Sequence, residues 1–156
     1  LQVTTDVMVG FPGETADDFE ATLAVCRDVG FGHIHAFRYS AREGTRAARM
    51  PDGVSHRVAA ERGRRLRDLA ASLQREFRCR LIGSVQEVLV EKVADGHATG
   101  YGQSYVPVRV DDGGGAAVGT LIATRIEAID AAGTLVGRIA ADGRAAGKRG
   151  GRSAAC

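Results

Sequence analysis

The hydrophobic positions of the first 40 residues change period twice, which is typical of a strand, a helix and a second strand in succession. An apolar run at residues 7–9 (VMV) ends at the breaking residues GFPG, and it predicts a strand buried on both faces. Apolar residues then recur at helical spacing and predict a helix over residues 16–29. These residues are Phe19, Leu23 and Cys26. The segment HIHAFRYS, residues 33–40, predicts the second strand.

Capping signals mark both ends of this helix. Thr15, followed three residues later by Asp18, has the pattern of a capping box, and Gly30 is placed to end the helix in the left-handed conformation. Short connections join the helix to the two strands, and parallel strands need a crossover of this kind. The segment therefore predicts a parallel βαβ unit.

A long amphipathic helix is predicted over residues 56–81. One apolar stripe runs along it, and eight arginines occupy the remaining faces. The stripe consists of Val58, Leu66, Leu69, Leu73 and Phe77. Gly63 lies inside this helix at a cost of about 1 kcal/mol relative to alanine, which is a modest objection to its continuity.

After Gly83 the hydrophobic period changes to two, and five short apolar segments alternate with Asp-Gly and Gly-rich turns. They cover residues 84–93, 97–101, 105–110, 120–129 and 134–139. This spacing predicts a small antiparallel barrel with a domain boundary near residue 82. Residues 141–156 are rich in Gly, Ala, Arg and Lys without periodicity and predict a flexible basic tail.

Composition and charge add three constraints. The 156 residues are 44% hydrophobic, enough to bury a core, and no apolar run approaches the roughly 18 residues that cross a bilayer. The three cysteines are too scattered for a disulfide framework, which favours a reducing, cytoplasmic compartment. Positive charge is concentrated in residues 38–82, where twelve arginines face five acids.

Together, the segments DVMVGFPGETADDF and IHAFRYSAREGT, the basic helix and the barrel resemble the C-terminal part of the radical-SAM methylthiotransferases, over about residues 3–140. The version His-x-Phe-x-Tyr-Ser-x-Arg-x-Gly-Thr resembles the enzymes that methylthiolate C2 of threonylcarbamoyladenosine next to the tRNA anticodon. The resemblance implies an α/β part followed by an all-β part. Residues 1–82 would be the last βα units of a partial radical-SAM (β/α) barrel, 83–140 a five-stranded, OB-like TRAM domain, and 141–156 the tail.

Two cofactors are implied by this resemblance, S-adenosylmethionine and [4Fe-4S] clusters. The family binds its cluster through a CxxxCxxC motif, which the chain lacks, so the ligands are expected upstream of Leu1 and no metal site is expected within the chain. Such a fragment is expected to be inactive alone. The candidate cofactor-binding residues are Met8, Gly10, Gly13 and Glu14, and the resemblance places Met8 against the adenine ring.

The implied partner is tRNA, with no membrane or DNA partner expected. Arg109 points outward between Val108 and Val110, and the other candidate RNA-binding residues are Lys92, Tyr101 and Tyr105. The two tyrosines either stack on bases or close the barrel. Residues 83–140 hold seven acids against four bases, a balance unlike that of a basic RNA-binding module.

Three alternatives remain open from the sequence. The intact protein acts on isopentenyladenosine in tRNA, or on a ribosomal protein, or is a non-catalytic RNA-binding protein that retains the barrel remnant as a scaffold. A CxxxCxxC motif upstream of residue 1 would favour an enzyme over the binding module.

Overall fold

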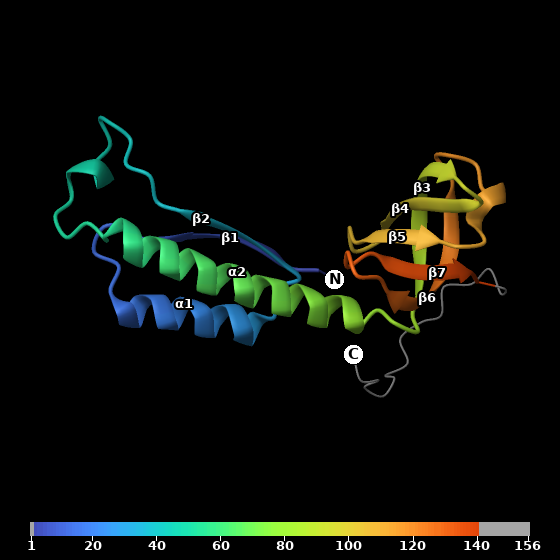
Figure 1. The fold of residues 1–156 in the computed structure, drawn as a ribbon, viewed down its shortest axis with the longest axis horizontal. Coiled ribbons are helices and arrows are strands. Elements are labelled where there is room, and N and C mark those ends of the chain that lie inside the picture. The colour runs from blue at the N-terminus through green and yellow to red at the C-terminus, as the bar shows by residue number, and fades with distance from the viewer. Residues whose placement is uncertain (1, 141–156) are drawn as a thin grey trace. The chain divides into compact units, whose positions relative to one another are not determined.

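The computed structural model describes residues 2–140, and within them the chain divides into two compact units (Figure 1). The first unit comprises Gln2–Phe77, and the second starts at Arg78. The predicted tail, residues 141–156, lies outside the described residues. None of the described helices is long and apolar enough to cross a membrane.

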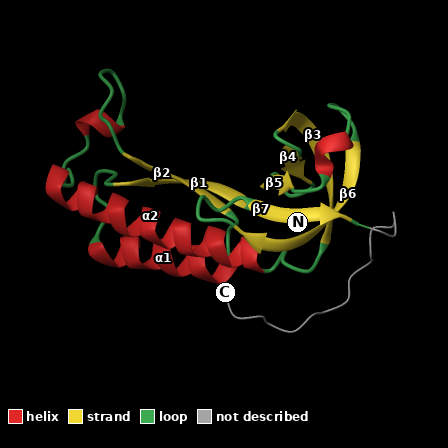
Figure 2. Cartoon of the chain, turned by 45° about the vertical axis from the view of Figure 1, so that its right-hand side comes forward, coloured by secondary structure: helices red, strands yellow, loops and turns green. Residues whose placement is uncertain are grey.

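The first unit is an α/β structure built on two parallel strands. Its elements are β1 (Thr4–Val9), α1 (Ala16–Val29), β2 (His33–Arg38), a short 3-10 helix (Ala47–Arg49) and α2 (His56–Cys79). The register of β1 and β2 runs from Thr4 opposite His33 to Val9 opposite Arg38. Both helices lie on the same side of the sheet (Figures 1 and 2). The predicted βαβ unit is confirmed.

Helix α1 has the ends that the sequence predicts. The Oγ of Thr15 accepts the backbone N–H of Asp18 at 3.1 Å, and the Asp18 carboxylate accepts the N–H of Thr15 at 2.9 Å. The Thr15 hydroxyl also donates to the Asp18 carboxylate at 2.7 Å, and this bond, together with the one from the Thr15 N–H, lowers the pKa of Asp18. At the other end, Gly30 adopts φ +66° and its N–H donates to the carbonyl of Cys26. The capping box and the glycine C-cap are confirmed.

The core of this unit lies between the sheet and the two helices. It consists of Val9, Phe19, Leu23, Cys26, Ile34, Leu66 and Leu73. Burial raises the pKa of the Cys26 thiol. The expectation that residues 7–9 are buried on both faces is wrong, because the helices cover one face only and Met8 on the other face is 43% exposed.

Helix α2 continues unbroken through Gly63. A Cβ at that position would lie 3.5 Å from the Cγ of Arg38, so the strand residue packs closely over the glycine. On the neighbouring turn, the guanidinium of Arg65 lies 5.1 Å from the ring centroid of Phe19 and also pairs with Glu20. Helix α2 therefore contacts α1 through Arg65 and the end of β2 through Gly63.

The second unit is a closed five-stranded barrel. Its strands are β3 (Val85–Ala94), β4 (His97–Gly102), β5 (Pro107–Val110), β6 (Leu121–Ile129) and β7 (Leu135–Ile139), with a 3-10 turn at Gly113–Gly115. The order around the barrel is β3-β4-β5-β7-β6, closed by pairing of β6 with β3. This is an OB-like arrangement, which confirms the predicted fold class.

One strand pair departs from the antiparallel barrel that the sequence predicts, because β5 and β7 are parallel. The reason is geometric: an odd number of strands cannot alternate in direction all the way round a closed ring. After β5, the chain crosses to β3, and β6 pairs with that strand. β7 then forms an antiparallel hairpin with β6 and lies beside β5. The barrel is therefore mixed.

Side chains from all five strands fill the barrel. The buried ones include Val88, Val90, Ala98, Val108, Val110, Ile126 and Leu135. Gly100 allows β3 and β4 to approach, since a Cβ there would lie only 1.8 Å from the carbonyl oxygen of Leu89. Residues that alternate with these face outward and form the surface on which RNA contacts were predicted.

Candidate functional site

The loop after β1, residues 10–14, is a tight turn built on two glycines. Gly10 and Gly13 have φ angles of +77° and +86°, a region that side-chain-bearing residues rarely adopt. The N–H of Glu14 donates to the carbonyl of Phe11 at 2.9 Å, and the N–H of Gly13 donates to the carbonyl of Asp52 at 3.0 Å. The turn is thus fixed internally and to the segment that precedes α2.

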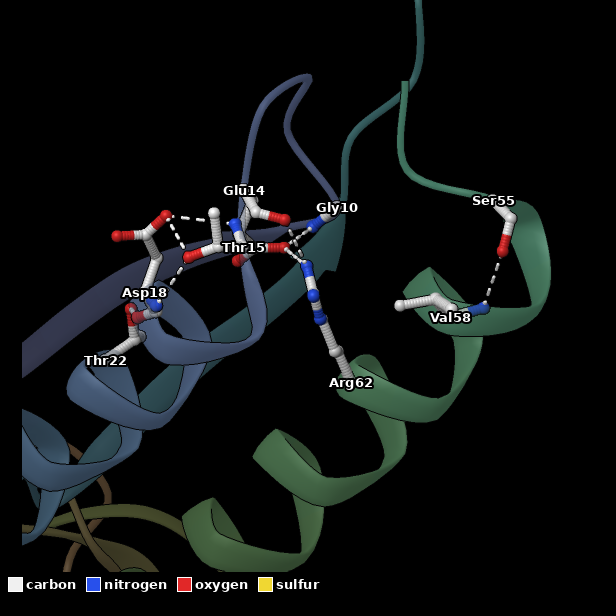
Figure 3. Close-up of polar contacts among 8 residues, drawn as sticks. All are labelled: Gly10, Glu14, Thr15, Asp18, Thr22, Ser55, Val58 and Arg62. Atoms are coloured by element: carbon white, nitrogen blue, oxygen red, sulfur yellow. Dashed lines mark hydrogen bonds and ion pairs between the residues drawn. The ribbon is translucent and has the colours of Figure 1, made fainter. Parts of the chain in front are cut away.

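Glu14 closes this loop. Its carboxylate accepts the N–H of Gly10 at 2.6 Å and forms an ion pair with Arg62 of α2, also at 2.6 Å (Figure 3). The same guanidinium nitrogen donates to the backbone carbonyl of Glu14 at 3.0 Å. The two side chains are only 10% and 11% exposed. One carboxylate oxygen of Glu14 therefore binds both the backbone of the loop and Arg62.

Gly10 also lies against α2. A Cβ at Gly10 would lie 2.7 Å from the Cβ of Ala59, closer than side chains pack. The position thus needs glycine for two reasons, the left-handed backbone and the close approach of the helix. Gly13 needs it only for the backbone, because nothing lies within 4 Å of its Cβ position.

The face of the sheet opposite the helices carries an apolar pair at the carboxyl end of the strands. Met8 of β1 is in register with Phe37 of β2, and the two side chains are 43% and 44% exposed. Further down the same face, Asp6 is in register with His35. A flat apolar ring can lie on Met8 and Phe37, next to the Gly10 loop. Phe37 was missed by the sequence reasoning, although its alternation with His35 places it on this face.

Two of the predicted RNA-binding residues lie in one row across the outside of the barrel. Lys92 of β3 is in register with Thr99 of β4, and Thr99 with Arg109 of β5. Arg109 already has acidic partners, because its Nε donates to Asp111 at 2.8 Å and its Nη1 lies 3.7 Å from Asp130. The hydrogen bond to Asp111 raises the pKa of Arg109.

Both candidate tyrosines are on the surface. Tyr101 lies two residues from Thr99 on β4 and is 44% exposed. Tyr105 lies in the β4–β5 turn with φ +52° and is 86% exposed. Neither ring fills the barrel interior, so the reading in which they close the barrel is wrong. Both side chains are accessible to solvent.

Relatives of the chain were found among curated proteins. The chain is 38% identical over 136 residues to a threonylcarbamoyladenosine tRNA methylthiotransferase of Chlamydia pneumoniae, a match that covers 87% of the chain and 32% of that protein. It is 42% identical over 107 residues to the protein of that name from Thermotoga maritima, over 68% of the chain and 25% of that protein. Its relatives are tRNA methylthiotransferases.

A second kind of methylthiotransferase also matches. The chain is 47% identical over 91 residues to a tRNA-2-methylthio-N(6)-dimethylallyladenosine synthase of Sorangium cellulosum, over 58% of the chain and 18% of that protein. The chain thus spans a third or less of the length of these methylthiotransferases. No family model matches it.

The methylthiotransferase relatives raise the question of which cofactors the residues present can hold. Within residues 2–140, no group of three His, Cys, Asp or Glu side chains is arranged to hold a metal ion. The described residues therefore do not fit an iron–sulfur cluster, which needs cysteine ligands. At Met8 and Phe37 they offer an exposed apolar pair at the carboxyl end of the two strands.

Arg62 is the main residue of the site that sequence reasoning missed. It lies four residues after Val58 and four before Leu66, so it falls on the apolar stripe of α2 rather than on its charged faces. An arginine at such a position must be paired when the helix is packed. That signal was available, but its partner Glu14 is 48 residues away and was not predictable from spacing.

Proposed function

We propose that the chain is part of a tRNA methylthiotransferase, in which it supplies the last βα units of the catalytic barrel and an RNA-binding barrel. The observation that carries this proposal is the 38% identity that extends over 136 residues and hence over both units. Residues 1–82 would belong to the radical-SAM core, and residues 83–140 would be the TRAM domain. The cytoplasm, where tRNA is modified, is its proposed location.

The proposed substrate position is C2 of threonylcarbamoyladenosine next to the anticodon. One feature favours it over the dimethylallyl alternative, the HAFRYSAREGT segment. The lengths of the matches do not separate the two substrates, because the relatives named for threonylcarbamoyladenosine match over up to 136 residues at 38% identity and those named for dimethylallyladenosine over up to 130 residues at 42%. The higher identity to the dimethylallyladenosine synthase, over 91 residues, keeps that substrate as the second candidate.

S-adenosylmethionine is the cofactor proposed for the open face of the sheet. Its adenine would lie on Met8 and Phe37, with the turn at Gly10 and Gly13 closing the end of the site. Glu14 would support this turn through Gly10 and Arg62 rather than contact the cofactor. When bound, S-adenosylmethionine supplies the radical and the methyl group. The [4Fe-4S] clusters would be held by residues outside this chain.

The proposed tRNA surface is the outer row of the barrel. OB-like barrels bind oligonucleotides on their second and third strands, which here are β4 and β5. β5 carries Arg109, and Lys92 lies at the other end of the row that Arg109 forms with Thr99; β4 carries Tyr101 two residues along from Thr99. The aromatic face and the two cations suit a base and backbone phosphates. Arg109 would exchange Asp111 for phosphate on binding.

Nucleoside mass spectrometry of tRNA tests the proposal. Cells in which the gene that encodes this chain is disrupted should lose the 2-methylthio group from threonylcarbamoyladenosine and keep it on dimethylallyladenosine. Loss from dimethylallyladenosine alone would select the second candidate substrate. If both modified nucleosides persist at wild-type levels, the chain is not part of the methylthiotransferase.

A further inference from the structure

The outside of the barrel carries a row of apolar side chains. Leu89 of β3 is in register with Tyr101 of β4 on one side and with Leu121 of β6 on the other. Tyr101 is also in register with Pro107 of β5. Leu89, Tyr101 and Leu121 are 43%, 44% and 65% exposed. Side chains directly opposite one another in neighbouring strands have Cβ atoms about 5 Å apart, so the four residues form a continuous strip, the apolar row.

On one side the apolar row borders the row of Lys92, Thr99 and Arg109. Thr99 lies two residues before Tyr101 on β4, and residues two apart in a strand share a face and lie about 7 Å apart. The two rows are therefore neighbours on one surface, with positive charges along one edge. Glu91 lies near this border, in the bulge of β3, where it has no register partner on β4.

On the other side the apolar row borders a carboxylate and an amide. Glu87 lies two residues before Leu89 on β3, and its carboxylate accepts the side-chain N–H of Gln103 at 2.7 Å. Both side chains are exposed. A carboxylate can accept about four hydrogen bonds, so Glu87 retains acceptor capacity. A ligand that crosses the apolar row therefore meets cations at one edge and hydrogen-bond acceptors at the other.

We propose that this surface binds an unpaired nucleotide of RNA and reads the edge of its base. The phosphate contacts Lys92 or Arg109, the base lies on Leu89 and Tyr101, and Glu87 accepts hydrogen bonds from N–H groups of the base. Unpaired bases have apolar faces and polar edges, which suits an apolar row between a cationic and an acceptor row. In a duplex these faces are stacked and inaccessible. The inference rests on the RNA-binding role proposed for the barrel.

The carboxylate of Glu87 favours one base over the others. Guanine has two neighbouring N–H donors at its Watson–Crick edge, N1–H and the N2 amino group, and one carboxylate can accept from both. Uracil offers a single N–H between two carbonyl oxygens, which a carboxylate repels. We therefore expect this surface to prefer an unpaired guanine. A basic protein segment would also suit an apolar row beside Glu87, but Lys92 and Arg109 disfavour it.

Fluorescence anisotropy of labelled oligouridine, with either uridine or guanosine at the central position, tests the proposal on the full 156-residue chain. The guanosine oligomer should bind about tenfold more tightly, the effect of one hydrogen bond to a charged group. Glu87→Gln should reduce this preference to less than twofold and leave the affinity for the uridine oligomer unchanged. Tyr101→Ala should weaken binding of both oligomers about tenfold, through loss of base stacking. Both side chains are exposed, so the variants should fold.

The matched control is Glu91→Gln, which removes the same charge from the same strand near the opposite border of the apolar row. It should keep the guanosine preference. The proposal is overturned if the wild-type chain binds the two oligomers equally, if Glu91→Gln and Glu87→Gln lose the preference equally, or if a fully paired RNA hairpin binds as tightly as the guanosine oligomer. Oligomer binding that requires Lys92 but shows no preference would reject the base readout alone and leave the RNA-binding role standing. Absence of binding by either oligomer at low salt would overturn both and favour a protein partner.

Discussion

The carboxylate of Glu14 and the guanidinium of Arg62, 48 residues apart in the chain, form a 2.6 Å ion pair that is almost fully buried. Through the same carboxylate oxygen, the pair also holds the N–H of Gly10 (Figure 3). Helix α2 is in this way connected to the turn that follows β1. Without this connection, the shape of the turn would rest on the left-handed conformations of its two glycines alone. Glycine also adopts these conformations in the unfolded chain, so they would not by themselves hold the turn.

Arg62→Met should lower the free energy of unfolding by about 3 kcal/mol, because it leaves the buried Glu14 carboxylate without its charged partner. Urea denaturation measures the change. The control is Arg64→Met, which breaks the exposed pair with Glu61 on the same helix and should cost less than about 1 kcal/mol. Equal losses in the two variants would show that burial of the Glu14 pair contributes nothing.

Gly10→Ala should destabilise the chain by about 1 kcal/mol more than Gly13→Ala. Both substitutions force alanine into a left-handed backbone, but only Gly10 has a neighbour, the Ala59 Cβ at 2.7 Å, in the way of a methyl group. A double-mutant cycle with Ala59→Gly should show favourable coupling for Gly10→Ala and none for Gly13→Ala. Similar losses and no coupling would contradict the close packing of α2 on the turn.

Asp18→Asn should make the free energy of unfolding depend less steeply on pH in the acidic range. The hydrogen bonds from Thr15 lower the pKa of Asp18 below its ordinary value of 3.8, so the unfolded chain binds a proton more readily than the folded one. The carboxylate therefore stabilises the fold above pH 3.8, and this contribution is lost as the pH falls through the lower folded-state pKa. Chemical denaturation at several acidic pH values measures the slope.

Asp17→Asn is the control for this experiment, because it removes a charge from the same helical turn and leaves the capping box intact. The slope should change more in Asp18→Asn than in Asp17→Asn. The reverse order would show that the helix dipole, and not the hydrogen bonds from Thr15, accounts for the effect.

Local signals allowed much of the fold to be predicted. Thr15, Asp18 and Gly30 act on neighbours within four residues, so the bounds of α1 follow from the sequence. The barrel strands were found from their alternation and turn residues, and the parallel β5–β7 pair follows from closure of a five-stranded ring rather than from any residue.

The candidate site was harder to predict from the sequence than the fold, because its contacts join residues that are distant in the chain. The pairing of Arg62 with Glu14 and that of Arg109 with Asp130 are set by packing of whole elements. The sequence also predicted that Met8 is buried, whereas its side chain is exposed. An apolar run does not reveal whether one face or both faces of a sheet are covered. Spacing predicted which residues share a face, but not their partners.

Binding of tRNA by the chain across salt concentrations, followed by fluorescence anisotropy, tests most directly whether the barrel's outer row is an RNA surface. Lys92→Ala and Arg109→Ala should each weaken binding about fivefold at low salt, roughly 1 kcal/mol, and should make the salt dependence shallower. Arg125→Ala is the matched control: it is an exposed barrel arginine in register with Val85, at the opposite end of β3 from Lys92, and should leave both quantities unchanged. Absence of tRNA binding even at low ionic strength, or an equal loss in all three variants, would contradict the account.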